Sequence, residues 1–445
     1  MLLLGLGLLG PAPELSALAE TRRQLPATDT LPWWKRQLRL RAETLLFTAY
    51  RDYREGRGTL NPGNRVAALT PGWAGLYLRP EARLRGKWAT LWAGPRLSVD
   101  HRFGAGQFAG PTGTEAELYF QTLRGRVTLG ERTALVAGRY LRETGVSSFV
   151  NPNNPFLLFS SRLNPRFEQR PGDFVELSRT LSPATTLSLL ANLGRQADPV
   201  FRAGDHAFHR GYALAGEVTA AAGSGGATLY LNEDRRFHLG GYAQFTAGEA
   251  VLLWADGALA HRAPRHYPQF SGRPGGGAPA PALRPGRENE RLFFSGLVGG
   301  SFTLASGPTL SLEYYRNGAG YHREQAALLR GLVAAGPPPP GEDPRLRGQY
   351  FGSLGRAIAP GLPFLRRNYL FLEVNQQDVG QLLDYALRGV YGPDDGGFQF
   401  NGVVDARLGA CTLSLVAQYN PGPAEREFAR LSRVFLLLGA SYFIY

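Results

Sequence analysis

Residues 433–445 read RVFLLLGASYFIY, a strand-length stretch in which both alternating sets of side chains are largely apolar. Three of its four aromatic side chains gather toward one end, at Tyr442, Phe443 and Tyr445. A strand with an apolar outer face and aromatic residues at one end suits the boundary between a bilayer and water. The stretch therefore predicts a membrane-spanning strand. The alternative is an ordinary buried last strand of a soluble sheet.

The composition argues against a helical membrane protein. The chain has 445 residues, enough for two or three ordinary domains or for one large barrel. Mean hydropathy is only -0.21, and no apolar run approaches the roughly 20 residues that a transmembrane helix needs. Membrane strands therefore explain the C-terminal stretch better than helices do.

The N-terminal residues predict an export signal. Met1 to Gly10 is the only uninterrupted apolar block, and Ala17-Leu18-Ala19 follows as a small-x-small cleavage pattern. The basic region that should come first is missing, so we expect the true start to lie upstream or the sequence to begin inside the signal. We divide the chain into a signal-peptide remnant (1–19), a periplasmic lead-in (20–39) and one barrel (40–445).

Alternation of period two is clearest in residues 76–85. Leu76, Leu78 and Leu84 fall on one face, whereas the other face carries a tyrosine and four charged side chains. A strand of this kind is half-buried. Four charges on one face need water beside them, so this face borders solvent or a wet lumen.

Similar segments recur along the whole chain and alternate with turns. Short connections are followed by mostly longer ones, with one short exception near Arg235-Arg236. We assign 381–391 to an outer loop, because counting it as a strand would reverse every later strand. Of the long loops, Ser271 to Gly286 and Pro337 to Pro340 should not be strands. Arg323 to Ala335 could form a short helix. The predicted strands are 40–50, 76–85, 88–100, 115–121, 132–142, 173–181, 185–194, 211–219, 227–234, 237–246, 250–260, 291–304, 309–317, 349–359, 367–377, 398–407, 411–420 and 433–445.

These features together resemble a known family. The last stretch resembles the closing strand of bacterial outer-membrane β-barrels, whose terminal aromatic residue, here Tyr445, is read by the barrel-insertion machinery. The whole chain is similar in pattern to porin-type barrels of the size of the eighteen-stranded substrate-specific channels and the alginate-export family.

The resemblance implies an all-β fold, a closed antiparallel barrel of about 18 strands (16–20) with short periplasmic turns and long outer loops. It also implies a Gram-negative outer-membrane location, contact with outer-membrane lipid, and passive diffusion of a hydrophilic solute without a cofactor. A homo-oligomer or a protein complex is compatible with this expectation.

Arginine is in large excess. Lys+Arg is 49 and lysine occurs only at Lys35 and Lys87, which leaves 49 - 2 = 47 arginines and a net charge of +13. Guanidinium groups bind anions in two-point geometry, and rings of basic side chains select anions in pores. The alternatives are codon bias and arginine–glutamate pairing across the wall without selectivity. The pore-lining candidates on predicted inner faces are Arg79, Glu81, Arg83, Arg85, Arg96, Glu117, Glu176, Glu217, Glu313, Glu373 and Arg407.

The connection 143–172 is the best candidate for a loop that folds inward. It contains the sequence NPNNPF at Asn151 to Phe156 and three arginines, Arg162, Arg166 and Arg170, which we take as constriction candidates. A solvated outer loop is the alternative.

Signatures of other functions are missing from the sequence. No Gly-x-Ser-x-Gly, phosphate-binding loop or His-Glu-x-x-His motif is present, so we predict neither an enzyme nor a metal site. The single cysteine, Cys411, cannot form an intrachain disulfide. The export signal argues against nucleic-acid binding. The main alternative function is a non-conducting barrel that acts as a scaffold for a surface or secretion complex.

Overall fold

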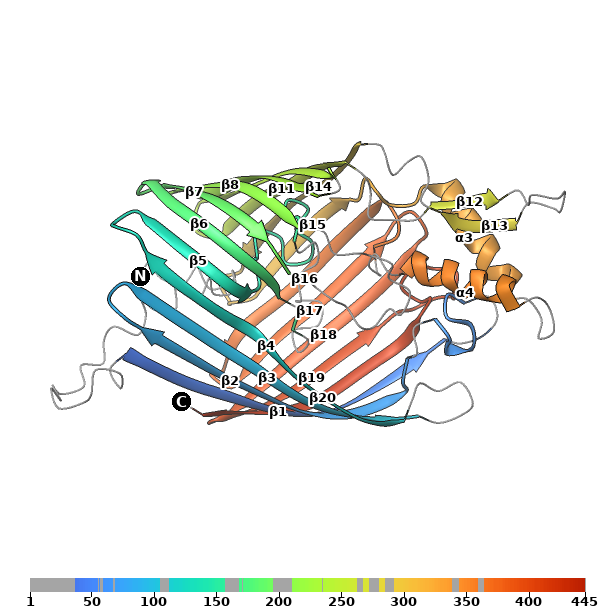
Figure 1. Ribbon diagram of the computed structural model, residues 1–445. Coiled ribbons are helices and arrows are strands. Elements are labelled where there is room, and N and C mark those ends of the chain that lie inside the picture. Colours follow the sequence, from blue (N-terminus) through green and yellow to red (C-terminus); the bar gives the residue numbers. More distant parts are fainter. Residues whose placement is uncertain are drawn as a thin grey trace.

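The computed structural model describes residues 37–444 except 55, 57–58, 67–68, 105–111, 157–167, 170, 195–209, 234, 262–266, 272–279, 285–291, 338–343 and 359–363. The expected signal-peptide remnant (1–19) and nearly all of the expected lead-in lie outside this part. Eighteen strands form one sheet (Figure 1). They are β1 (Leu38–Tyr53), β2 (Gly72–Arg85), β3 (Ala89–Phe103), β4 (Gly113–Thr128), β5 (Thr133–Tyr140), β6 (Gly172–Ser182), β7 (Thr185–Asn192), β8 (Gly211–Ala220), β9 (Gly223–Asn232), β10 (Phe237–Ala247), β11 (Val251–His261), β14 (Leu292–Thr303), β15 (Thr309–Arg316), β16 (Asn368–Val379), β17 (Leu383–Gly392), β18 (Gly397–Leu408), β19 (Cys411–Tyr419) and β20 (Ser432–Ile444).

The sheet closes on itself. Each strand pairs antiparallel with the next one along the chain, and β20 pairs antiparallel with β1, with Leu45 opposite Ser441. Closure removes the two free edges that an open sheet would leave without hydrogen-bond partners. The predicted closed antiparallel barrel of about 18 strands is confirmed.

Side chains alternate between the inside and the outside of the wall. In β15 the inward residues Glu313 and Tyr315 are buried, whereas Leu312 on the outward face is 58% exposed. Large apolar side chains are exposed in the same way on most other strands. Leaving one such side chain in water instead of burying it costs about 1.5–3 kcal/mol of free energy. This belt therefore suits contact with lipid.

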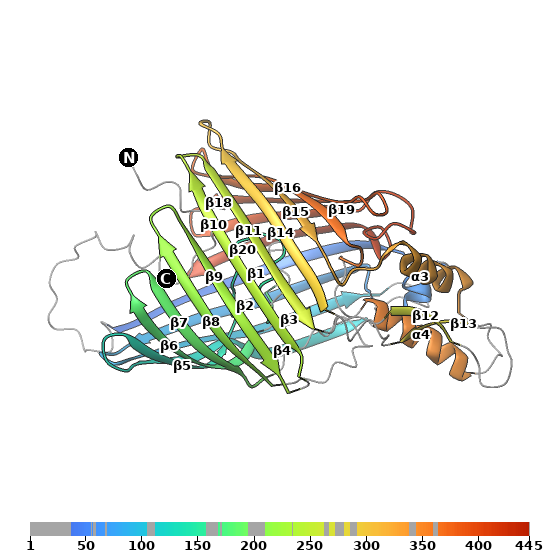
Figure 2. The same ribbon diagram turned by 90° about the horizontal axis from the view of Figure 1, so that it is seen from above.

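The two ends of the barrel differ. At one end the strands are joined by short turns, such as 183–184 between β6 and β7 and 409–410 between β18 and β19. Most of the long connections lie at the other end, which we call the loop end. Figures 1 and 2 place helices α3 (Arg323–Ala335) and α4 (Pro344–Ile358) at the loop end, far from the start of β1.

Two sequence assignments are wrong, and they compensate each other. Residues 349–358 are helical, not a strand, because Tyr350 and Leu354 lie one helical turn apart and are buried in the same cluster as α3. The segment 381–391, assigned to a loop, contains most of β17, in which Leu387 is exposed and Val390 is buried. One strand is exchanged for another, so the number of strands and the directions of the later strands are unaffected.

The predicted helix at Arg323–Ala335 is confirmed as α3. The expectation that Ser271 to Gly286 contains no strand is wrong. A separate hairpin pairs β12 (Tyr267–Ser271) with β13 (Ala280–Arg284). Proline is tolerated there because each strand of a two-stranded hairpin is an edge strand. Some of its backbone N–H positions point away from the partner strand, and proline can occupy these without losing a ladder hydrogen bond.

The long connections pack into a small core of their own at the loop end. Leu329 of α3, Leu354 of α4 and Leu60 of the connection after β1 are all buried in it. The connection after β1 also carries a short 3-10 helix, η1 (Pro62–Asn64). This core fixes the outer loops relative to the barrel. None of the helices in the described part is long and apolar enough to cross a membrane.

Candidate functional site

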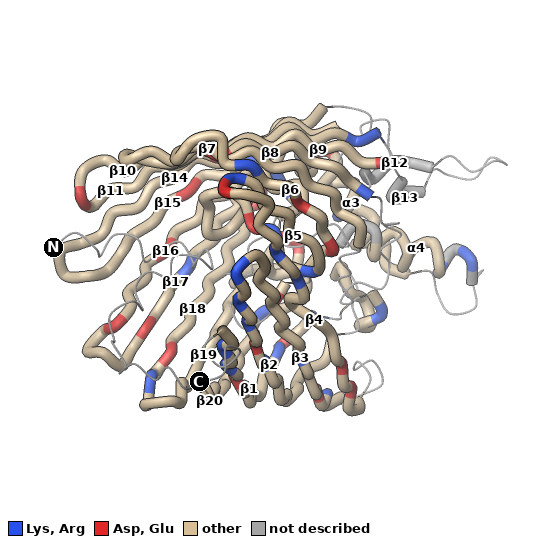
Figure 3. Tube along the Cα trace, turned by 60° about the vertical axis from the view of Figure 1, so that its left-hand side comes forward, with Lys and Arg blue, Asp and Glu red and all other residues tan. Residues whose placement is uncertain are grey.

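The structure places all eleven pore-lining candidates on the inward set of their strands. Those on the first half of the barrel come from β2, β3, β4, β6 and β8, and the others from β15, β16 and β18. Figure 3 shows the Lys and Arg positions concentrated over β2 to β5. The inner face is therefore charged, and its charges are unevenly distributed around the ring.

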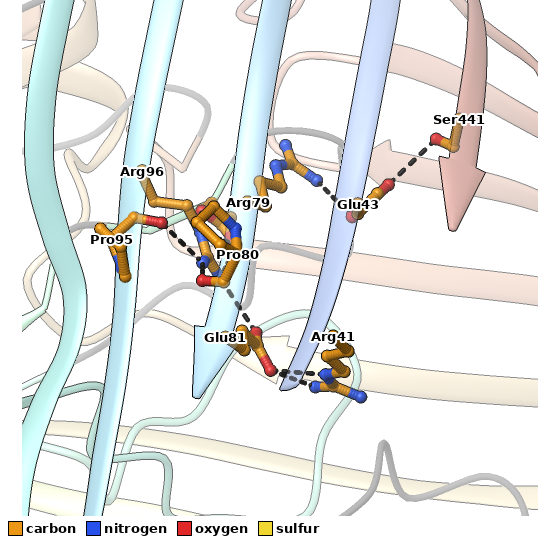
Figure 4. Close-up of polar contacts among 9 residues, drawn as sticks. Arg41, Glu43, Arg79, Pro80, Glu81, Pro95, Arg96 and Ser441 are labelled. Carbon is orange, nitrogen blue, oxygen red and sulfur yellow. Dashed lines mark hydrogen bonds and ion pairs between the residues drawn. The ribbon is translucent and has the colours of Figure 1, made fainter. Parts of the chain in front are cut away.

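A chain of ion pairs runs across β1, β2 and β3 (Figure 4). Glu81 binds Arg41 through Oε2, with Nη2 at 2.5 Å, and Arg96 through Oε1, with Nη2 at 3.2 Å. Arg96 also binds Glu168 in two-point geometry, with Nε 2.8 Å from Oε2 and Nη2 2.9 Å from Oε1. Arg96 is therefore held between two carboxylates.

A second pair lies beside this chain. Arg79 Nη1 lies 3.3 Å from Glu43 Oε2, and Ser441 of β20 donates to Glu43 Oε1 at 2.9 Å (Figure 4). The contact joins β2, β1 and β20 on the inner face at the point where the barrel closes. Around the middle of these strands the arginines are thus paired with carboxylates.

Nearer the short-turn end of the same wall, arginines stand beside aromatic and hydroxyl side chains. The strand register sets Arg83, Trp92 and Arg124 in one row across β2, β3 and β4. The guanidinium carbons lie 5.3 Å and 4.6 Å from the centre of the Trp92 ring. A second row sets Arg85 and Arg126 on either side of Thr90. We call these two rows the arginine wall. Cation–π contact holds a guanidinium in place without neutralising it.

Of the other candidates on the first half of the barrel, Glu117 and Glu176 lie toward the loop end and Glu217 lies toward the short-turn end. Tyr140 donates to Glu176 at 3.0 Å, and Arg142 lies 3.7 Å from Glu176 and 3.5 Å from Glu217. Glu117 lies on β4, opposite Ser98.

On the opposite half, two candidates form ion pairs. Glu373 binds Arg388 at 2.9 Å. Arg407 binds Asp378 at 2.6 Å and Asp384 at 2.5 Å.

The connection between β5 and β6, which we call the inward connection, folds into the barrel. The Asn153 backbone and side-chain nitrogens donate to Asp256 on the inner face of β11, the backbone N at 2.7 Å. Ser147 Oγ donates to Glu313 on β15 at 2.6 Å. Between these anchors, Phe149 packs among inward apolar side chains of the same wall.

The same connection also reaches the wall opposite. Glu168 binds Arg96 on β3, and the backbone oxygen of Gln169 accepts a hydrogen bond from Gln121 on β4 at 2.8 Å. Because β3 and β4 lie across the ring from β11 and β15, the connection contacts opposite sides of the lumen. The constriction candidates Arg162, Arg166 and Arg170 lie outside the described residues.

Sequence reasoning missed several residues of this inner surface. Arg124 and Arg126 were missed because the predicted strand stopped at 121, and Arg388 because its strand was assigned to a loop. Asp256 lies in a strand whose alternation is weak. Alternation continued from Glu117 would have turned Leu123 inward instead, because a register shift opposite Gly94 and Pro95 moves the inward set of β4 to the even positions.

No family model and no curated protein sequence matches the chain. Among solved structures, the barrel is similar to Acinetobacter baumannii OccAB1, with a TM-score of 0.55, 11% identity, and coverage of 91% of this chain and 96% of that chain. It is also similar to Pseudomonas aeruginosa OccK5 (OpdH), with a TM-score of 0.50, 11% identity, and coverage of 92% and 99%. At these identities the likeness concerns the fold. Together with the closed wall and the apolar belt, it defines a porin-like outer-membrane β-barrel.

Proposed function

We propose that the protein is an outer-membrane channel, not an enzyme, through which hydrophilic anions diffuse passively. The observation that carries the proposal is the arginine wall. Arg83 and Arg124 stack on Trp92, and Arg85 and Arg126 flank Thr90, on the inner face near the short-turn end.

The charge balance of the inner face of β2 to β4 supports anion preference. The inward positions of these strands hold seven arginines and four carboxylates, a surplus of 7 - 4 = 3 positive charges. A unit charge about 8 Å away in water interacts with each guanidinium by about 0.5 kcal/mol. This attraction is strong enough to favour an anion over a cation and weak enough to let it leave. The arginines are Arg79, Arg83, Arg85, Arg96, Arg102, Arg124 and Arg126, and the carboxylates Glu81, Asp100, Glu115 and Glu117.

The inward connection strengthens this asymmetry. Asp256 and Glu313, two acidic groups of the opposite wall, accept hydrogen bonds from the connection and are buried. A solute that passes through the lumen meets the arginine wall on one side and the connection on the other. We propose that the connection forms the constriction.

The test is conductance of the refolded protein in planar bilayers, with the reversal potential measured across a potassium chloride gradient. The wild type should prefer chloride. Arg83→Gln with Arg124→Gln removes about 1 kcal/mol of attraction for an anion at 8 Å, so the chloride preference should fall at least about threefold after screening by salt.

The matched control is Arg179→Gln. Arg179 is an exposed arginine on the outward set of β6, so its replacement should leave the reversal potential unchanged. A double variant with wild-type selectivity would contradict the role of the arginine wall.

A non-conducting scaffold is the second candidate, and the inward connection is the observation that favours it. Because the connection touches both sides of the lumen, it could plug the barrel. A correctly folded wild-type barrel with no conductance would support this function and overturn the channel.

A further inference from the structure

A cavity of about 420 Å³ lies at the loop end. It is formed by the end of β15, the start of β16, helix α3 and the turn after β17. Five arginines line it, together with Tyr321, His322, Asn368 and Asp394. The arginines are Arg316, Arg323, Arg330, Arg366 and Arg367.

The lining is strongly positive. Asp394 is the one carboxylate among the lining residues, and its oxygens accept hydrogen bonds from the Arg367 and Asn368 backbone nitrogens, at 2.8 Å and 3.0 Å, and from the Asn368 side chain. Burial by itself would raise the pKa of Asp394, but these hydrogen bonds and the charge of Arg366 outweigh burial and lower it. Asp394 is therefore ionised, and the lining carries a surplus of about four positive charges.

Arg366 is the most deeply buried arginine of the lining. It is only 4% exposed. Its Nη2 donates to the backbone oxygen of Asp394 at 3.1 Å, but Nε and Nη1 are buried without a hydrogen-bond partner in the described part of the chain. Its charge lies in a low-dielectric surrounding, where it acts more strongly on an anion bound among the other arginines than it would in water. Tetrahedral oxyanions are the ligands that a guanidinium fork fits best.

The cavity adjoins the lipid-facing belt. Arg316 and Asn368 occupy the outward set of β15 and β16, the same set as the exposed residues Leu312, Tyr314 and Leu370. Tyr314 donates to Asn368 at 2.8 Å, and Arg316 donates to the same oxygen at 3.0 Å. A ligand bound here would have its charged part among the arginines and any apolar part against the belt.

We propose that this cavity binds the phosphate group of a phosphorylated lipid in the outer leaflet. The shared chemistry is a phosphate anion, for which a free phosphate would be the other source. The exposed apolar side chains directly below the arginines favour the lipid. The site lies on the outside of the wall, so lipid binding does not depend on conduction through the barrel.

The experiment uses native mass spectrometry of the full barrel in detergent, with retained lipid counted after addition of lipid A, dephosphorylated lipid A or inorganic phosphate. The site variant is Arg323→Gln with Arg330→Gln, two positions on α3 that leave the buried Arg366 in place. Arg366→Gln is a second variant, accepted only if its heat-modified gel migration matches the wild type. The control is Arg179→Gln.

We expect retention of lipid A by the wild type and the control, at least tenfold weaker retention by the site variants, and little retention of the dephosphorylated lipid. Equal retention by the wild type and the folded site variants would overturn the proposal. Tight binding of inorganic phosphate together with equal retention of the two lipids would also overturn it, since the site would then be one for free anions.

Discussion

The inward connection should control the conductance, and its anchors can be removed one set at a time. Asp256 accepts two hydrogen bonds from Asn153, and Glu313 accepts bonds from Ser147 Oγ at 2.6 Å and the Ser148 backbone N at 3.4 Å. At a net value of about 1 kcal/mol each, four bonds hold the connection with roughly 4 kcal/mol. Loss of all four corresponds to a change of about 10³-fold in the equilibrium between anchored and released forms.

Apolar contacts supply a further anchor on this wall, while Glu168 and Gln169 hold the other end of the connection to β3 and β4. Phe149 and Val150 are fully buried against the inner wall, which contributes about 1.5–3 kcal/mol for each side chain. Asp256→Ala with Glu313→Ala should therefore populate a released form without emptying the anchored one. Addition of Phe149→Ala should make the released form dominant.

The assay is single-channel recording of the three proteins. The double variant should show a second, larger conductance level and increased noise, and the triple variant should spend most of its time at that larger level. Glu373→Ala is the matched control, because Glu373 lies on the same wall but binds Asn375 and Arg388 instead of the connection. A folded triple variant with wild-type conductance and noise would refute the anchoring argument.

Three further predictions concern the outer loops and the ion pairs. Burial, with the charge of Asp395, raises the pKa of Glu427 to about 8. The folded state then holds a proton that the unfolded state releases near pH 4.5, so its contribution to stability is present below pH 4.5 and is lost as the pH rises to about 8. Hydrogen exchange of the Leu365 amide, corrected for intrinsic rate, should show less protection at pH 8 than at pH 5, and Glu427→Gln should abolish the difference; equal wild-type protection would contradict this. Leu329→Ala should cost about 2–5 kcal/mol of local stability and speed proteolysis between α3 and α4. The control Leu328→Ala, at the half-buried neighbour, should speed it less. Equal proteolysis rates for the two variants would place Leu329 outside the core. The single variant Arg96→Gln should lower the melting temperature more than the double variant Arg96→Gln with Glu168→Gln, because the single change leaves the Glu168 carboxylate without its cation. If the two substitutions lowered the melting temperature additively, the two side chains would not be coupled.

The barrel could be predicted from the sequence because its rule is local. Leu76 to Arg85 alternates in and out whatever its neighbours do, and each further strand repeats the pattern. The alternation rule failed for residues 349–358, because burial of Tyr350 and Leu354 in the loop-end core favours a helix there. A short apolar run does not distinguish the period of a strand from that of a helix. β17 was missed for a topological reason. Once 349–359 was counted as a strand, counting 381–391 as well would have reversed the direction of every later strand.

The site could be predicted only in part. Alternation alone placed Arg79, Glu81 and Arg83 on one face, because a strand fixes the direction of its own side chains. It could not pair Arg79 with Glu43 or Arg96 with Glu168, because strand register and the path of a connection are set by contacts far apart in the sequence. The arginine cavity at the loop end was missed for the same reason, since its residues come from three separate segments.

The two interpretations of the arginine excess, selective lining and neutral pairing, apply to different depths of the same wall. Around the middle, Arg79 and Arg96 meet carboxylates on neighbouring strands or on the inward connection. Toward the short-turn end, Arg83 and Arg124 both lie against the ring of Trp92. Paired arginines fix the geometry of the wall and contribute little field, whereas arginines stacked on an aromatic ring keep their charge. Anion preference should therefore respond to substitution of Arg83 and Arg124 and hardly to Arg79→Gln combined with Glu43→Gln, which removes a whole ion pair; codon bias does not explain such a contrast.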